Sequence, residues 1–380
     1  MARKVFGDPV DKMTAYCTYC PKMCRFSCPA AQAEDRETVT PWGMMRLFEL
    51  VKDDAVEPSQ EVAEIFYHCM GCRRCQTWCR HENDVPHAMW EARAWMAEQG
   101  FVPPVLEGFA ESFLKESFPH KEPAAPGETP GESTTVDEIF DSSSDYFFFP
   151  DCETRQHSPD LVLRAGKLLE MVCGKKVRLV TTLDGAGKGC CGFPLLSAGR
   201  KEEYLRYRAE LEDELSGAKV LITDCAAMAS LHRKDTSWGF ESALEVTHLV
   251  ELLSSTLGRL EVPHRIDLSD LIFHDSCFTG RQLDLFDATR DVVRALGTGD
   301  FEEFPFTREE ASCCGGPGHY HLVEPEASER CAETLMDEMD QKGAKGVICG
   351  SATCKKAFGR VRKADVAQDI LEIACRAFGV

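Results

Sequence analysis

The residue type through which this chain could do chemistry is cysteine, which occurs 20 times in 380 residues. Four of these cysteines form two Cys-Cys dipeptides, Cys190–Cys191 and Cys313–Cys314, and each dipeptide is followed directly by glycine. Adjacent cysteines form a poor disulfide with each other, because a disulfide needs Cα atoms roughly 4.4–6.8 Å apart in a particular orientation. Two thiolates on a tight, glycine-relaxed turn are better suited to bind the same metal cluster. The pairs therefore indicate metal or redox chemistry.

Eight further cysteines lie in two short runs near the N-terminus. The run over Cys17–Cys28 has the spacing C-x2-C-x3-C-x3-C-P, and the run over Cys69–Cys79 has the spacing C-x2-C-x2-C-x3-C. The second spacing is that of bacterial ferredoxins, in which three cysteines bind one 4Fe–4S cluster and the fourth binds the cluster of the other run. We therefore predict two 4Fe–4S clusters, with Cys17, Cys20, Cys24 and Cys79 on cluster one and Cys69, Cys72, Cys75 and Cys28 on cluster two.

Zinc is the alternative metal for these runs, because C-x2-C pairs also occur in sites where four thiolates bind one zinc ion. Zinc sites usually take two pairs from separate segments. Four closely spaced cysteines in each run favour iron–sulfur clusters instead.

The part of the chain that follows is an internal duplication. Gly217–Met228 aligns without a gap on Gly343–Cys354 at an offset of 126 residues, the two Cys-Cys-Gly triplets are 123 apart, and Cys152 and Cys277 are 125 apart. Each half contains a short apolar strand, a helical pattern, the triplet, a charged helical pattern and a second strand pattern. Alternating strands and helices predict an α/β core with parallel strand pairing, and three agreeing offsets make chance similarity a poor explanation.

The duplication predicts one metal site in each half. Under the gapless alignment Cys225 corresponds to Ser351, and Met228 corresponds to Cys354, as if each half had kept a different member of an ancestral C-x-x-C pair. The first predicted site consists of Cys152, Cys190, Cys191 and Cys225, and the second consists of Cys277, Cys313, Cys314 and Cys354.

This pattern, C-x(about 35)-CCG-x(about 35)-C written twice behind a two-cluster ferredoxin module, resembles the CCG-domain (cysteine-rich domain) iron–sulfur proteins. The family includes heterodisulfide reductase, the glycolate oxidase iron–sulfur subunit and lactate-utilisation proteins. The resemblance implies non-cubane 4Fe–4S clusters at the CCG cysteines, where a disulfide can be reduced. Full family sites use five cysteines, whereas each half here offers four. Whether the CCG domain holds one or two further clusters is therefore left open. Sites with a single cysteine in place of the final C-x-x-C pair resemble those of the glycolate and lactate branch, whose members transfer electrons.

The predicted fold class is α+β overall, with a small, mainly α-helical ferredoxin module followed by a duplicated α/β CCG domain. Apolar residues at helical spacing predict helices over Pro41–Val51, Ser59–Cys69 and Pro86–Gly100. A stretch rich in Pro, Gly, Ser and acidic residues marks the domain boundary. We expect a helical di-cluster module over 1–117, a linker over 118–145, a first CCG half over 146–262 and a second CCG half over 263–380.

Charge and hydropathy exclude several classes of partner. The formal charge is −20, from 63 acidic and 43 basic residues, so binding to a nucleic-acid backbone is excluded. The sequence has no run of about 18 apolar residues and no secretion signal at its start, so we expect no transmembrane segment and a cytoplasmic protein, peripheral at a membrane only through partners.

The predicted function is that of an electron-transfer subunit of an oxidoreductase complex. Electrons would pass between a flavoprotein or other redox subunit, the two 4Fe–4S clusters and the CCG sites, and a further partner would be a membrane protein that carries a quinone site or a cytochrome. The first alternative is a heterodisulfide-reductase-like enzyme that reduces a disulfide at a non-cubane cluster. The second is a zinc-stabilised protein-binding module. No residue is assigned a catalytic role; for His274, His319 and His321 we expect hydrogen-bonded structural roles, with proton delivery as the alternative.

Overall fold

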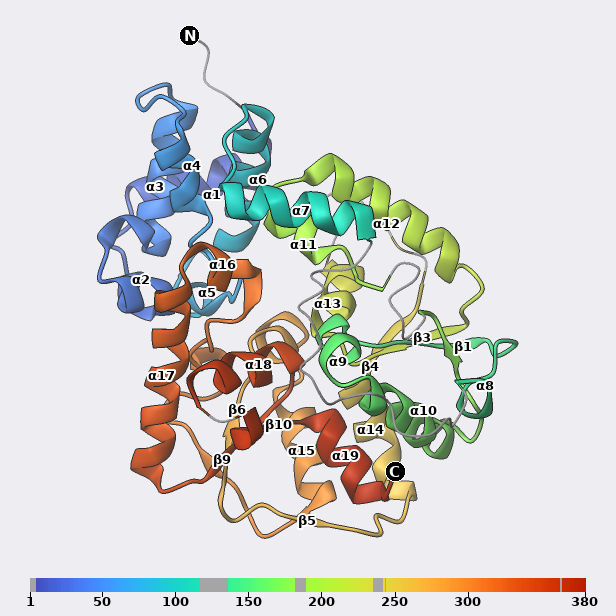
Figure 1. Cartoon of the computed structure of the whole chain (residues 1–380). Helices are drawn as coiled ribbons and strands as arrows, with labels where there is room; N and C mark the ends of the chain where they lie inside the picture. Colours follow the sequence, from blue (N-terminus) through green and yellow to red (C-terminus); the bar gives the residue numbers. More distant parts are fainter. Residues whose placement is uncertain (1–4, 117–135, 182–188, 235–241, 243, 363) are drawn as a thin grey trace.

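A computed structural model describes residues 5–116, 136–181, 189–234, 242, 244–362 and 364–380 of the chain. Helices coloured blue to teal form an N-terminal module, and two α/β halves follow it, green to yellow and orange to red (Figure 1). The predicted fold class, α+β with a helical module and a duplicated α/β domain, is confirmed. Among the helices of the described residues, none combines the length and the apolar character that crossing a lipid bilayer requires.

The N-terminal module is built from short helices whose starts are set by the sequence. Thr40 caps the helix that begins at Pro41 by accepting from the backbone of Gly43 at 3.0 Å, and Ser59 caps the next helix in the same way. All three predicted helices of this module are present. The helices are α1 (Val10–Thr18), α2 (Pro29–Glu34), α3 (Pro41–Lys52), α4 (Gln60–Phe66), α5 (Arg74–Thr77), α6 (Val85–Glu98) and α7 (Pro104–Glu116), with 3-10 turns η1 (Arg25–Ser27) and η2 (Glu37–Val39).

The first half contains a four-stranded parallel sheet in the order β2-β1-β3-β4. Its strands are β1 (Tyr146–Phe149), β2 (Arg178–Leu179), β3 (Val220–Thr223) and β4 (Val246–His248). Its helices are α9 (Cys152–His157), α10 (Pro159–Cys173), α11 (Phe193–Ser197), α12 (Lys201–Leu215), α13 (Ala226–Lys234) and α14 (Leu249–Thr256), followed by the 3-10 turn η4 (Leu257–Arg259).

The second half contains a four-stranded parallel sheet in the order β8-β6-β9-β10. Its strands are β6 (Leu271–His274), β8 (Glu302–Glu303), β9 (Gly346–Cys349) and β10 (Ala367–Asp369), and β5 (Ile266–Asp267) pairs separately with β7 (Gly297–Thr298). Its helices are the π-helix η5 (Phe278–Gln282), α15 (Phe286–Leu296), α16 (Tyr320–Val323), α17 (Pro325–Lys342), α18 (Ala352–Val361) and α19 (Ile370–Phe378), with 3-10 turns η6 (Arg308–Glu310), η7 (Pro317–His319) and η8 (Ala364–Val366).

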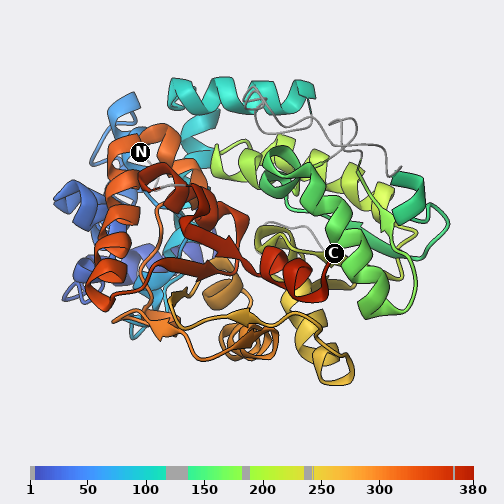
Figure 2. The same ribbon diagram turned by 60° about the horizontal axis from the view of Figure 1, so that its bottom comes forward.

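The two sheets have the same strand order, because β2, β1, β3 and β4 correspond in sequence to β8, β6, β9 and β10. The halves also pack on each other reciprocally, with α14 of the first against α15 of the second and α19 of the second against α10 of the first. Both views show the orange-to-red second half beside the blue N-terminal helices as well as beside the green first half (Figures 1 and 2). The N-terminal module contacts both halves, because its helices α6 and α7 also pack on α11 of the first half.

The expected linker is only partly visible. Residues 118–135 lie outside the described residues. The rest of the stretch contains α8 (Val136–Ile139), and Ile139 is buried in the main core, where it packs with Phe140 close to Gly166 of α10. The last residues of this stretch therefore pack on the first half.

Candidate metal centres

The thiols predicted for cluster one, Cys17, Cys20, Cys24 and Cys79, are brought together in the structure. The Cys17 thiol interacts electrostatically with the other three, and it accepts a hydrogen bond from Nδ2 of Asn83 at 3.3 Å. Burial raises the pKa of Cys17 to about 12. A metal ion that binds this thiol must therefore displace its proton.

The thiols predicted for cluster two also lie together. Cys75 interacts electrostatically with Cys72, Cys69 and Cys28, and Cys28 is the residue directly before α2. Burial raises the pKa of Cys69 to about 11. Cys75 interacts with Cys24 of the other group as well, so the two groups are neighbours. Two adjacent sets of four thiols fit a pair of 4Fe–4S clusters, each of which needs four cysteine ligands.

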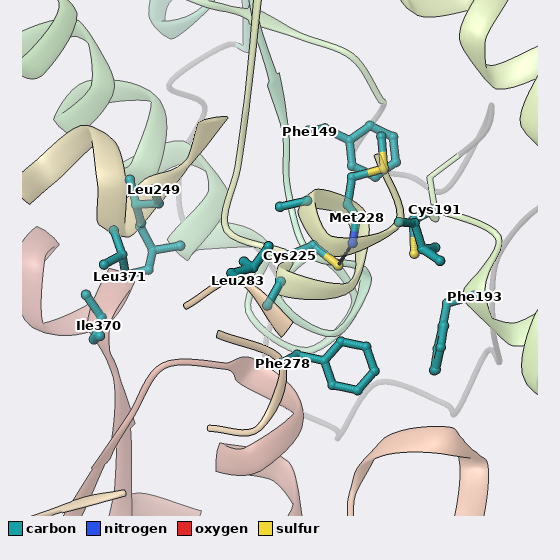
Figure 3. Packing of buried hydrophobic residues seen from close by; sticks show 14 of the residues in the cluster. Phe149, Cys191, Phe193, Cys225, Met228, Leu249, Phe278, Leu283, Ile370 and Leu371 are labelled. Atoms are coloured by element: carbon teal, nitrogen blue, oxygen red, sulfur yellow. Dashed lines mark hydrogen bonds between the residues drawn. The ribbon is translucent and has the colours of Figure 1, made fainter. Parts of the chain in front are cut away.

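The four cysteines of the first CCG site come from three separate segments. Cys152 begins α9 directly after β1, Cys190–Cys191 precede α11, and Cys225 follows β3. Side-chain hydrogen bonds connect them in the order Cys152, Cys190, Cys191 and Cys225. Figure 3 shows Cys191 and Cys225 among the surrounding buried apolar side chains. Hydrogen bonds from Cys190 and Cys225 hold the pKa of Cys191 well below its usual range.

The second CCG site repeats this arrangement. Cys277 follows β6, Cys313–Cys314 lie in the loop before η7, and Cys354 lies in the first turn of α18. The sulfur atoms of Cys277 and Cys313 are 4.0 Å apart, and those of Cys314 and Cys354 are 3.3 Å apart. All four side chains are buried. Hydrogen bonds from Cys313 and Cys354 hold the pKa of Cys314 well below its usual range.

The glycine after each cysteine pair has a left-handed backbone, with φ of 85° at Gly192 and 83° at Gly315. We expect Gly192→Ala to cost about 1–2 kcal/mol, because alanine is strained at positive φ and its Cβ would approach side-chain rings, those of Tyr207 at 2.9 Å and Tyr204 at 3.5 Å, and no backbone atom as closely. Gly315→Ala should cost at least about 3 kcal/mol, because its Cβ would also clash with the backbone carbonyl of Ser328. Thermal unfolding of the two variants under anaerobic conditions tests this order, and equal midpoints would contradict it.

The two CCG sites face each other across one cavity of about 200 Å³. Its walls include the aromatic rings of Phe109, Phe193 and Phe278 and the imidazoles of His319 and His321. Six of the predicted ligands also line it, namely Cys152, Cys190, Cys191, Cys225, Cys277 and Cys354. A small molecule in this cavity would touch both cysteine sets at once.

The second CCG site also touches the N-terminal module directly. The thiol of Cys313 hydrogen bonds to the sulfur of Cys72, which belongs to the cluster-two set. Two guanidinium groups flank this contact: Nε of Arg281 donates to the carbonyl oxygen of Cys72 at 2.6 Å, and Nε of Arg74 donates to that of Glu310 at 2.7 Å. The hydrogen bond from Cys313, together with Arg281 and Arg74, outweighs burial and lowers the pKa of Cys72 to about 6.

The residues at or beside the positions that lack a cysteine of the five-cysteine pattern make other contacts. Met228 is fully buried, and its sulfur accepts from Nη1 of Arg208 at 3.7 Å. Ser351 lines the cavity. Cys349 is a fully buried strand residue whose thiol donates to the backbone carbonyls of Ser351, at 3.5 Å, and of Gln368, at 3.6 Å.

The comparisons with known proteins match both parts of the chain. A 4Fe–4S dicluster domain matches residues 13–83, which contain all eight cysteines of the two N-terminal runs. The cysteine-rich domain named CCG matches twice, over residues 146–227 and 271–359. The predicted 4Fe–4S cofactors and the predicted duplication are therefore confirmed, and for the N-terminal cysteines the dicluster match favours iron over zinc.

Three relatives show the range of proteins with this architecture. One component of the dihydromethanophenazine:CoB–CoM heterodisulfide reductase of Methanosarcina barkeri is 23% identical over 344 residues, which cover 86% of this chain and 81% of the relative. The probable glycolate oxidase iron–sulfur subunit of Bacillus subtilis is 22% identical over 413 residues, covering 92% of both chains. The EtfAB:quinone oxidoreductase of Syntrophomonas wolfei is 30% identical over 151 residues, covering 38% of this chain and 20% of the relative.

Proposed function

This chain belongs to the iron–sulfur proteins that join a 4Fe–4S dicluster domain to a duplicated cysteine-rich CCG domain, and we propose that it transfers electrons within an oxidoreductase complex. A 4Fe–4S cluster, when bound, takes up and releases single electrons. The observation that carries the proposal is the continuous series of cysteine sets. The Cys24–Cys75 interaction joins the two N-terminal sets, and the Cys72–Cys313 hydrogen bond joins the second of them to the second CCG site.

The residues between these sets would exclude water from the electron path and stabilise the negative charge of an arriving electron. Cys72 and Cys313 are held in contact inside the protein, and the guanidinium groups of Arg74 and Arg281 lie beside them. A nearby positive charge stabilises the reduced, more negative form of a redox centre. We infer that Arg74 and Arg281 favour arrival of an electron at this junction.

The proposed partners follow from what the chain and its relatives contain. The sequence has no flavin or NAD fingerprint, so a flavoprotein or another redox protein would exchange electrons with the N-terminal clusters. One relative is named a quinone oxidoreductase and another is a component of a heterodisulfide reductase. On the other side we therefore propose a quinone- or cytochrome-bearing membrane subunit, or a thiol/disulfide couple, with either direction of flow.

A second candidate function is supported by the cavity between the CCG sites. Cysteines of both sites line it, as do the imidazoles of His319 and His321 and the ammonium group of Lys356. A disulfide substrate placed there would have electron-supplying sites on two sides, with the polar side chains of His319 and Lys356 beside it. Under this alternative the chain is itself the reductase, and the N-terminal clusters supply its electrons.

Iron counting and activity of the isolated chain distinguish these functions. Anaerobically purified protein should contain about sixteen irons per chain if both CCG sites are filled, and about eight if both are empty. Under the transfer proposal the isolated chain should exchange electrons with a reduced flavoprotein but should not reduce low-molecular-weight disulfides. Disulfide reduction by the isolated, reduced chain would favour the second function, and negligible iron after reconstitution would contradict both.

A further inference from the structure

Besides Cys225 and Ser351, the two halves differ at two further positions near the metal-binding cysteines. The last residue of β1 is Phe149, three residues before Cys152, and the last residue of β6 is His274, three residues before Cys277. The same comparison pairs Met228 with Cys354, at an offset of 126 residues. The first half thus has two residues without a strong metal donor where the second half has an imidazole and a thiol.

In the second half these two donors lie together. The donor atoms of His274, Cys314 and Cys354 all lie within 4.8 Å of one another. His274 is 2% exposed, its Nε2 has no partner at ordinary hydrogen-bond distance, and its imidazole interacts with the thiol of Cys314. A thiol is a weak hydrogen-bond partner, and a bound metal ion would satisfy the buried nitrogen better.

The imidazole is also held in place by its surroundings. The ring of His274 packs edge-on against the ring of Phe358, with centroids 5.2 Å apart, and against the ring of Phe304, at 6.0 Å. Both contacts are apolar, so they fix the ring without offering a hydrogen bond. A pre-positioned ring beside two thiols is the arrangement that a metal ligand needs.

At the positions that correspond to His274 and Cys354, the first half has side chains of a different kind. The sulfur of Met228 accepts from Arg208, and a nitrogen of the same guanidinium group lies 3.2–3.3 Å from the imidazole nitrogens of His232. Figure 3 shows Phe149 and Met228 in the same part of the buried core as Cys225. A buried cation and apolar side chains therefore stand where the second half has His274 and Cys354.

We propose that His274 is the fifth ligand of the metal cluster at the second CCG site, together with Cys277, Cys313, Cys314 and Cys354. The inference rests on the proposed function, because it requires a cluster at that site. Five donors exceed the four of a tetrahedral zinc site and suit a cluster of several irons. Replacing thiolate by neutral imidazole raises the potential of an iron–sulfur centre. The site next to Cys72 would then have a higher potential than an all-thiolate site, which favours arrival of electrons from the N-terminal clusters.

Pulsed electron paramagnetic resonance of the whole protein, labelled with 15N only in histidine, tests this ligand directly. A redox titration poises each cluster in its paramagnetic state. We expect one strongly coupled histidine nitrogen on the signal of the second CCG site in the wild-type protein. His274→Phe, which installs the residue of the first half, should lose that coupling. His274→Cys should also lose it while keeping the iron, and the midpoint potential of that cluster should fall.

The control is His321→Phe, which removes another buried imidazole nitrogen without a hydrogen-bond partner, on a residue that lines the cavity. It should keep the nitrogen coupling. Wild-type protein with a filled second CCG site and no strongly coupled histidine nitrogen would overturn the ligand assignment even if no variant folds. So would an unchanged coupling in His274→Phe. An iron count near eight would also overturn the ligand assignment, because the second CCG site would then hold no cluster. Failure of the proposed function would look different: the clusters would be filled, but no flavoprotein donor would reduce them.

Discussion

Cys72→Ala is expected to remove about four irons from each chain and to slow reduction of the second CCG site by at least about 100-fold. Loss of an outer partner of a metal ligand already costs 10–100-fold in metal affinity, and Cys72 is a predicted ligand that also contacts Cys313. The substitution therefore removes both a thiolate of cluster two and the contact between the modules. Iron and sulfide analysis gives the stoichiometry. Stopped-flow reduction with a flavoprotein donor gives the rate.

Cys331→Ala is the matched control. Cys331 is 6% exposed, and its thiol interacts electrostatically with Cys314 and Cys72, yet it belongs to none of the four predicted ligand sets. Removing one buried sulfur should cost stability but leave the iron content unchanged. If Cys331→Ala lost as much iron as Cys72→Ala, the assignment of ligands in this region would be wrong. If Cys72→Ala kept its full iron content and rate, the proposed path through Cys72 would be wrong.

Much of the fold was predictable because its constraints are local and repeated. Thr40, Ser59 and Gly100 mark helix ends by chemistry that acts within a few residues, and the helices begin or end beside them. The repeat offsets predicted two similar halves, and the identical strand order of the two sheets confirms the duplication. Asp151 and Asp224, which precede cysteines, accept hydrogen bonds from the backbone amides of Glu153 and Asp151, at 2.9 and 2.7 Å.

The relation between the sites was not predictable, because it depends on how the modules pack. Nothing in the spacing of Cys72 and Cys313, which are 241 residues apart, indicates that their sulfur atoms meet. The shared cavity likewise results from the packing of α9 and α13 of the first half against α18 and η5 of the second. Arg74 and Arg281 carry no motif, and they become significant only because folding places them beside Cys72.

The role of His274 was also not predictable from the sequence alone. A histidine near a cysteine is most often a hydrogen-bonded structural residue, and the sequence alone favoured that role. In the structure its imidazole interacts with the thiol of Cys314, and Cys354 lies next to both, so its polar neighbours are predicted metal ligands. The available signal was the internal comparison of Phe149 with His274, which is meaningful only together with the exchange of Met228 for Cys354.

The second large effect is expected from Arg290, which fixes the loop that carries Cys277. Its guanidinium group donates two hydrogen bonds to Asp275, at 2.8 and 2.7 Å, and two to Glu303, at 2.8 and 2.7 Å. The Arg290 and Asp275 side chains are 4% and 3% exposed. Arg290→Met would leave the buried carboxylate of Asp275 without its partner, which typically costs about 3–5 kcal/mol. For a chain of this size that corresponds to a fall of roughly 4–6 °C in the unfolding midpoint.

Arg294→Met is the control, one turn along the same helix. Arg294 makes a longer ion pair, 3.8 Å to Asp300, and the two side chains are 50% and 78% exposed. Exposed pairs contribute about 0–1 kcal/mol, so its midpoint should stay within about 1 °C of the wild-type value. Unfolding is followed anaerobically at a fixed heating rate, because cluster loss makes it irreversible.

Adding Asp275→Asn to Arg290→Met separates the lost charge pair from lost packing. The amide carries no charge, and it can still accept the hydrogen bond that the backbone of Arg308 donates to Asp275, at 2.7 Å. The double variant should therefore recover part of the stability that Arg290→Met loses. If it is no more stable than the single variant, the cost lies in the packing of the arginine over the ring of Phe273 and not in the stranded carboxylate. If Arg290→Met and Arg294→Met unfold at the same temperature, the buried ion pair does not hold the Cys277 loop.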